Sequence, residues 1–175
     1  MSDAPNEDEW DTCCHEAGHV VMYRLFGVPV LFAELLGPLH GRTEPAHGTE
    51  GPTAREKLEF GSIEILATLA GTAANELMRP GRAWDQGDET DLGRAREDAA
   101  KNYHRSMYTS ADYLAGLEGL ATKILTRNLD LIANIAEALW KAKTLDMAAI
   151  NDLIPPGRSA KEDLEAWLDD WPRRP

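Results

Sequence analysis

Residues 7–26 read EDEWDTCCHEAGHVVMYRLF, and the interpretation of the whole chain starts from this stretch. Acidic residues open it, apolar residues recur through it at helical spacing, and Gly27 follows it, so we expect one long helix. Inside it, His15, Glu16 and His19 form an H-E-x-x-H pattern. Residues four apart lie on the same face of a helix, so both imidazoles can reach one metal ion.

The position of Glu16 suits a general base better than a metal ligand, because it directly follows the first histidine of the pair. Zinc with nitrogen ligands lowers the pKa of a bound water to about 7, and a neighbouring carboxylate can then take its proton. The pattern therefore predicts a hydrolytic Zn²⁺ site.

A catalytic zinc site normally has three protein ligands and one open position. The extended pattern that supplies a third histidine shortly after the pair is not present here. The remaining candidates are three carboxylates on later helices: Glu76, Asp88 and Asp91. Surface or hydrogen-bonding roles are expected for three further histidines: His40, His47 and His104. A thiolate ligand from Cys13 or Cys14 is disfavoured, because adjacent cysteines beside His15 point away from its face; we expect them to pack in the core.

Two apolar stretches and several amphipathic ones follow the first helix. Residues 28–36 predict a strand, and residues 39–46 predict a second strand more weakly. Thr53 and Glu56 form a capping-box pattern, which predicts a helix from Ala54 to Leu77. Further helices are expected, with Asp88 and Ser110 as caps of the first two: 89–107, 111–125, 129–141, 146–153 and 159–171.

The predicted architecture is mainly α, with a small β-strand unit inserted after the H-E-x-x-H helix. We expect a metallopeptidase domain over residues 1–155 and an acidic helical tail over residues 156–175. One face of the last helix is apolar, so this helix is expected to fold back on the domain, with partner docking as the alternative. That face consists of Leu164, Trp167, Leu168 and Trp171.

The chain has 175 residues and carries 30 acidic against 18 basic side chains, a formal net charge of −12. Such a surface repels phosphate backbones, so nucleic acid is not an expected partner. No stretch approaches the roughly 18 consecutive apolar residues of a membrane helix, and the acidic N-terminus is unlike a secretion signal. We therefore expect a cytoplasmic protein without membrane contact.

Three segments resemble the peptidase domain of the FtsH-type, ATP-dependent zinc metalloproteases: HEAGH at 15–19, AGTAANEL at 70–77 and GDETDL at 87–92. The helices over 128–150 add weaker support, so the resemblance covers about 11–154. It implies a helical zincin-like domain whose zinc ligands are His15, His19 and Asp91, with Glu16 as catalytic base. Glu76 would then orient a ligand imidazole.

The chain also departs from that family. We expect a domain without the family's membrane anchors and ATPase module, because these 175 residues contain no long apolar stretch and no phosphate-binding G-x-x-x-x-G-K-[ST] loop. Asn75 stands where the family commonly has an acidic residue, and Thr72 where arginine is common.

The expected function is that of a zinc metalloendopeptidase that hydrolyses unfolded or extended polypeptides. Without its own motor, the domain would take loose peptides or substrates that a separate unfoldase or adaptor delivers. The oligomeric state is open, with a homo-oligomer as one alternative. A second interpretation is a non-catalytic peptide-binding or regulatory module that keeps the fold and the metal. A structural metal site ranks last, because structural zinc prefers four ligands, often cysteines.

Overall fold

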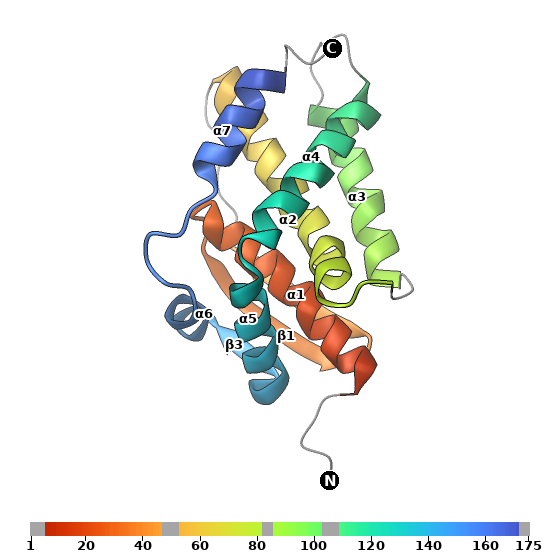
Figure 1. The fold of residues 1–175 in the computed structure, drawn as a ribbon, viewed down its shortest axis with the longest axis vertical. Coiled ribbons are helices and arrows are strands. Elements are labelled where there is room, and N and C mark those ends of the chain that lie inside the picture. Colours follow the sequence, from red (N-terminus) through yellow and green to blue (C-terminus); the bar gives the residue numbers. More distant parts are fainter. Residues whose placement is uncertain (1–5, 47–52, 82–85, 103–108, 172–175) are drawn as a thin grey trace.

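The computed structural model describes residues 6–46, 53–81, 86–102 and 109–171. These residues form seven helices and one three-stranded sheet, which confirms the mainly helical prediction (Figure 1). In chain order the elements are α1 Glu7–Leu25, β1 Val30–Gly37, β2 His40–Pro45, α2 Ala54–Met78, α3 Gln86–Asn102, α4 Ser110–Thr126, α5 Leu129–Ala142, β3 Thr144–Asp146, α6 Met147–Leu153 and α7 Lys161–Asp170.

Helix α1 is the centre of the core, with α2, α5 and the sheet packed around it. The Asn6 side chain caps its first turn by accepting a hydrogen bond of 2.8 Å from the Glu9 amide. Between Thr12 and Leu25 every residue except His19 and Arg24 is buried. The helix is therefore held on all sides, which fixes the directions of the H-E-x-x-H side chains.

The sheet is antiparallel, with strand order β2-β1-β3, so β2 is an outer strand. Both strands predicted after the first helix are confirmed. The sequence predicts no strand between the helices over 129–141 and 146–153, but residues 144–146 form β3, and Ala33 pairs there with Leu145. Three residues are too few to show an alternating pattern in sequence, and the pairing depends on β1.

Helix α2 crosses α1 at very short range. Its predicted capping box is present, because Thr53 and Glu56 each hydrogen-bond to the other's backbone amide. A Cβ atom added at Gly18 would lie 2.3 Å from the carbonyl oxygen of Ala70 and 2.7 Å from Ala74 Cβ. The two backbones thus touch at Gly18, and no side chain fits between them.

Two predicted helix starts are wrong by one or a few residues. Helix α3 begins at Gln86, so Asp88 lies inside its first turn and is not its cap. Helix α4 is capped by Thr109, whose hydroxyl accepts from the Asp112 amide, and not by Ser110. The predicted end of α3 at Met107 lies outside the described residues.

Helix α7 folds back onto α4, as predicted. Trp167 and Trp171 stack with ring centroids 4.9 Å apart, and both rings contact Tyr113. Gly116 makes room for them, since a Cβ atom there would lie 2.8 Å from Trp167 Cζ2. This aromatic cluster joins the same buried core as α1 and α2.

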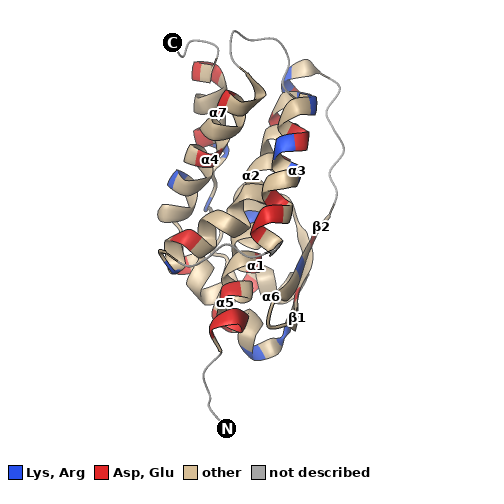
Figure 2. Ribbon diagram, turned by 90° about the vertical axis from the view of Figure 1, so that its right-hand side faces the viewer, with Lys and Arg blue, Asp and Glu red and all other residues tan. Residues whose placement is uncertain are grey.

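Acidic residues occur along several helices in the view of Figure 2. In the described part of the chain, no helix combines the length and apolar composition that crossing a bilayer requires.

Candidate metal centre

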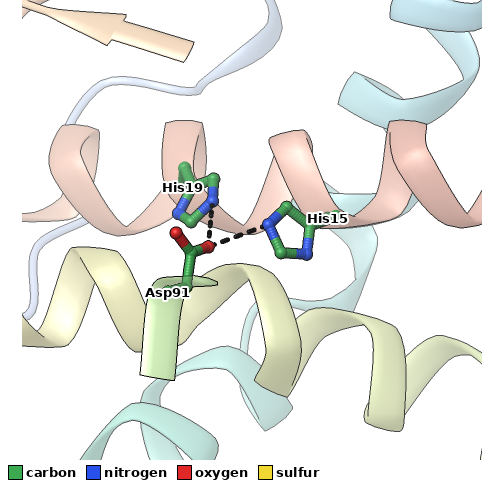
Figure 3. A group of neighbouring side chains, drawn as sticks. All are labelled: His15, His19 and Asp91. Carbon is green, nitrogen blue, oxygen red and sulfur yellow. Dashed lines mark hydrogen bonds and ion pairs between the residues drawn. The ribbon is translucent and has the colours of Figure 1, made fainter. Parts of the chain in front are cut away.

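His15 and His19 extend from the same face of α1 and meet Asp91 from the first turns of α3. Their Nε2 atoms lie 2.9 and 3.1 Å from the same oxygen of Asp91, Oδ2. Figure 3 shows both imidazoles directed at this carboxylate. The structure therefore brings together the three residues that the resemblance implied as ligands.

The spacing of the three groups fits a small metal ion. One ligand atom from each of His15, His19 and Asp91 lies within 4.8 Å of the other two. A tetrahedral zinc ion with bonds near 2.0–2.1 Å separates its ligand atoms by roughly 3.3 Å. The observed separations of 2.9 and 3.1 Å need only a small expansion to reach that value.

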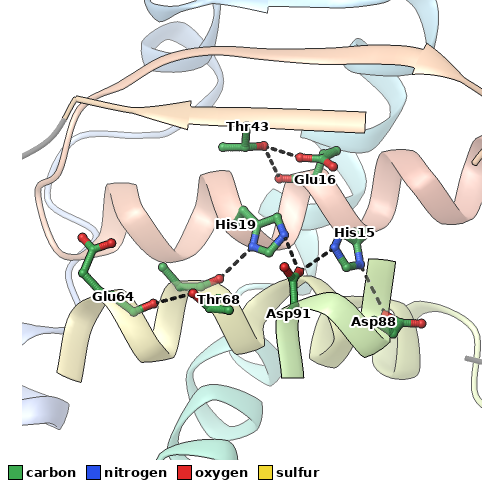
Figure 4. Close-up of polar contacts among 9 residues, drawn as sticks. His15, Glu16, His19, Thr43, Glu64, Thr68, Asp88 and Asp91 are labelled. Atoms are coloured by element: carbon green, nitrogen blue, oxygen red, sulfur yellow. Dashed lines mark hydrogen bonds and ion pairs between the residues drawn. The ribbon is translucent and has the colours of Figure 1, made fainter. Parts of the chain in front are cut away.

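The second nitrogen of each imidazole faces an oxygen acceptor. His19 Nδ1 donates to the carbonyl oxygen of Ala67 over 2.7 Å. His15 Nδ1 lies 3.4 Å from Oδ1 of Asp88, a carboxylate that is fully buried. Metal-binding histidines usually have such partners, which fix the tautomer and leave the other nitrogen for the metal (Figure 4).

The prediction that Glu76 orients a ligand imidazole is wrong. Its side chain is exposed and lines a different pocket, between α2, α3 and α4. Glu76 stands five residues after Gly71, which is roughly 140° around the helix from the side that faces α1. The carboxylate that faces a ligand imidazole is that of Asp88, beside His15.

Gly71 on α2 leaves the space that the two imidazoles occupy. A Cβ atom at this position would lie 2.6 Å from His15 Nε2 and 2.7 Å from His19 Nε2. Any larger residue would therefore push at the nitrogen atoms that face Asp91. Segment 70–77 therefore contributes to the site through the missing side chain of Gly71, and none of its described residues is a candidate ligand.

Glu16 is held by strand β2. The Thr43 hydroxyl donates to Glu16 Oε2 over 2.6 Å. Gly41 packs on the same side chain, because a Cβ atom there would lie 2.5 Å from Glu16 Oε1. The strand after the H-E-x-x-H helix thus fixes the carboxylate that the sequence marks as a base.

A cavity of about 670 Å³ opens beside these groups. Glu16 and all three candidate ligands line it, together with residues of α2, α3 and β2. His40 also lines this cavity but is not in the group that could hold an ion. His47 and His104 lie outside the described residues. A cavity of this size can admit part of an extended peptide.

Charge interactions within the cluster are strong. Burial by itself would lower the pKa of His15, but the carboxylates of Asp88 and Asp91 outweigh burial and raise that pKa to about 10. Burial likewise opposes ionisation of Asp91, yet His15 and His19 hold its pKa well below the usual range. At neutral pH the metal-free cluster therefore pairs an imidazolium with a carboxylate.

The adjacent cysteines pack in the core, as predicted. Cys13 and Cys14 are 0% and 1% exposed, and neither is in a disulfide. Burial raises the pKa of Cys13 to about 12, so its thiol stays protonated at neutral pH. Neither belongs to the group of residues that could hold an ion.

No model of a known protein family matches the sequence, and a search of curated proteins found no match. Function is therefore inferred from the site itself.

Proposed function

We propose that this protein is a zinc-dependent metallopeptidase that hydrolyses peptide bonds in unfolded or extended polypeptides. The observation that carries the proposal is the convergence of His15, His19 and Asp91 beside a cavity that Glu16 also lines. Two imidazoles and one carboxylate are a donor set that catalytic zinc sites use, with one position left open.

The surroundings of the three ligands support zinc. Each imidazole has an oxygen acceptor at Nδ1, from Ala67 and Asp88, and Gly71 leaves room at the Nε2 atoms. Bound zinc would supply Lewis acidity, which polarises a carbonyl and lowers the pKa of water at the open position to about 7.

Glu16 is assigned the role of general base and, afterwards, general acid. The Thr43 hydroxyl bonds to one carboxylate oxygen and leaves the other, Oε1, to accept a proton from water. Glu16 would then pass this proton to the leaving amine, so one side chain serves both halves of the reaction.

We assign strand β2 the role of binding an extended substrate. It is an outer strand of the sheet, and its residues line the cavity. A peptide could pair with such an edge through backbone hydrogen bonds, which give affinity without requiring one sequence. A separate unfoldase or adaptor would supply such chains from folded proteins, and assembly into a homo-oligomer is compatible with the same site.

The proposal also includes three further points: similarity to the FtsH-type peptidases, a zincin-like fold and a cytoplasmic location. Its support is the order of the motifs along the chain. The histidine pair comes first, then Gly71 on the neighbouring helix, then Asp91 on the helix after that.

The test compares Glu16→Gln with Asp91→Ala, using Glu76→Ala as the control. We expect Glu16→Gln to bind zinc like the wild type but to lose cleavage of fluorescently labelled casein by a factor of 10² or more. Asp91→Ala should lose both zinc and cleavage, whereas Glu76→Ala should keep both. Zinc content is measured by atomic absorption after dialysis.

Full cleavage by Glu16→Gln would remove Glu16 from the mechanism. If Glu76→Ala lost zinc and Asp91→Ala retained it, the ligand assignment would be wrong. Zinc and peptide binding without any cleavage by the wild type would instead favour the non-catalytic binding module.

A further inference from the structure

Two arginines line the cavity beside the candidate metal centre, and they differ in the ion pairs that they form with the described residues. Arg42 of β2 pairs with Glu44 over 2.9 Å and lies 5.0 Å from the centre of the Phe32 ring. Arg94 of α3 is exposed and forms no ion pair with any residue in the described ranges. No described residue therefore neutralises its guanidinium by an ion pair.

Arg94 lies close to the candidate metal ligands. It follows Asp91 by three residues on α3, so the two side chains share one face, with Cβ atoms about 5–6 Å apart. Tyr23 gives independent evidence of this proximity. Burial and Glu64 raise the pKa of Tyr23 well above its usual range; Asp91 raises it further and Arg94 opposes the shift. The Tyr23 hydroxyl therefore lies near Asp91 and Arg94, and all three residues line the same cavity.

The side-chain charges around the cavity favour an anion at Arg94. Glu16 and Glu44 also line the cavity and would repel a carboxylate placed near them, away from the zinc that the three ligands would hold. A guanidinium offers two parallel N–H donors, which match the two oxygens of a carboxylate. Peptide substrates carry carboxylates in two places, on Asp and Glu side chains and at the carboxyl terminus.

We propose that Arg94 is a specificity-determining residue that binds a carboxylate of the peptide substrate. This inference rests on the proposed peptidase function and names the substrate class: chains with an acidic group near the cleaved bond. An extended chain advances about 3.3 Å per residue. The bound carboxylate therefore lies within a few residues of the bond that is cleaved.

The experiment measures binding without turnover, in the zinc-loaded Glu16→Gln background. Fluorescence anisotropy is recorded with three labelled peptides of one neutral sequence. The first is amidated and uncharged, the second is amidated with a single Glu moved along the sequence, and the third has a free carboxyl terminus. We expect the free-terminus peptide or one of the Glu peptides to bind about tenfold more tightly than the neutral peptide.

Arg94→Gln should remove this tenfold preference and leave the affinity for the neutral peptide unchanged. Arg94→Glu should reverse it in favour of a peptide with Lys at the same position. Arg96→Gln is the matched control, because Arg96 is also exposed on α3 but lies on another side of the helix and is not part of the cavity lining. It should bind all peptides like the parent. Circular dichroism checks that each variant is folded.

The two carboxylate sources give different patterns. Preference for the free terminus alone identifies a carboxypeptidase-like site, and preference for one Glu position identifies an endopeptidase with an acidic subsite. Equal binding of neutral and acidic peptides, or equal effects of Arg94→Gln and Arg96→Gln, would overturn the role of Arg94. In that case cleavage by the wild type would still support the proposed function, whereas carboxylate-selective binding without cleavage would support Arg94 and contradict the peptidase.

Discussion

Gly71 on α2 and Gly116 on α4 each make room for aromatic rings from a neighbouring helix, but the rings differ. The space at Gly71 holds the imidazoles of His15 and His19, whereas the space at Gly116 holds the indole of Trp167. Both are positions where a Cβ atom would come closer than 3 Å to a ring atom. The same packing device therefore serves a candidate metal centre in one region and an aromatic contact in the other.

The groups behind the rings account for the difference between the two regions. Behind the imidazoles lie a fully buried Asp88 and the Ala67 carbonyl, both acceptors that can hold a histidine in one tautomer. Around the indole lie Tyr113 and Trp171, which add apolar contact area. A glycine on a helix face thus indicates close packing, and the neighbouring polar groups indicate whether chemistry is expected there.

The largest expected effect comes from Gly71→Ala. The new methyl group would press on both Nε2 atoms, so we expect zinc affinity to fall by more than about 100-fold, beyond the usual cost of losing one outer-shell partner. Competition with a fluorescent zinc chelator measures the affinity.

Gly119→Ala is the control, because a Cβ atom there meets nothing within 4 Å. It should keep zinc affinity and raise the free energy of unfolding by about 0.5–1 kcal/mol. Unchanged zinc affinity in Gly71→Ala would contradict the assignment.

A smaller effect, of a different kind, is expected from Gly116→Ala. The added methyl group would lie 2.8 Å from Trp167 Cζ2 and force the indole to move. Overpacking of this kind costs about 1–3 kcal/mol of stability. Urea unfolding of the metal-free protein should show this loss, while the zinc affinity of the folded variant stays at the wild-type value. A parallel loss of zinc affinity would show that the two regions are coupled.

The smallest predicted effect is the release of about one proton when zinc binds. His15 is charged at pH 7 in the metal-free protein, because its pKa is raised from 6.5 to about 10. Zinc needs a neutral imidazole, so binding should release about one proton, and affinity should rise about tenfold per pH unit until pH approaches the pKa. Calorimetry at pH 7 in two buffers of different ionisation enthalpy counts the proton. Binding heats that do not depend on the buffer would contradict the charged state.

The same pKa shift sets the sign of the effect on stability. The pKa of His15 is higher in the folded state than its ordinary value of 6.5. Its charge therefore stabilises the metal-free fold fully below that value, and this contribution is lost as pH rises towards 10. Zinc should restore stability over that range, so the melting temperatures with and without zinc should diverge as pH increases.

The elements that carry the histidines could be predicted from local patterns. The H-E-x-x-H spacing and the Thr53–Glu56 capping box depend on residues three or four positions apart, which a helix brings together. Asp91 lies 72 positions after His19, so no local pattern connects them, and only the family resemblance distinguishes it from the other two candidate carboxylates. The position of Asp88 beside His15 depends on how α3 packs against α1 and α2, and no local pattern encodes this.

Two errors have identifiable causes. Glu76 follows Gly71 by five residues, so its side chain lies on a different side of α2 from the one that approaches α1. Ser110 and its neighbour Thr109 are both good cap residues, so residue type alone does not distinguish which of them caps α4. Asp112 completes a capping box with Thr109, three residues before it, and this spacing was a usable signal.

Gly18, the second middle residue of the H-E-x-x-H pattern, limits which sequences can form this centre. Its missing side chain lets the backbones of α1 and α2 touch at Ala70, and the next residue of α2, Gly71, leaves the space that the histidine rings occupy. The two central letters of the pattern are therefore not equivalent in this protein. A homologue with alanine at position 18 would have to separate its helices, and a motif search that leaves that letter unrestricted would accept chains unable to close the pocket around an ion.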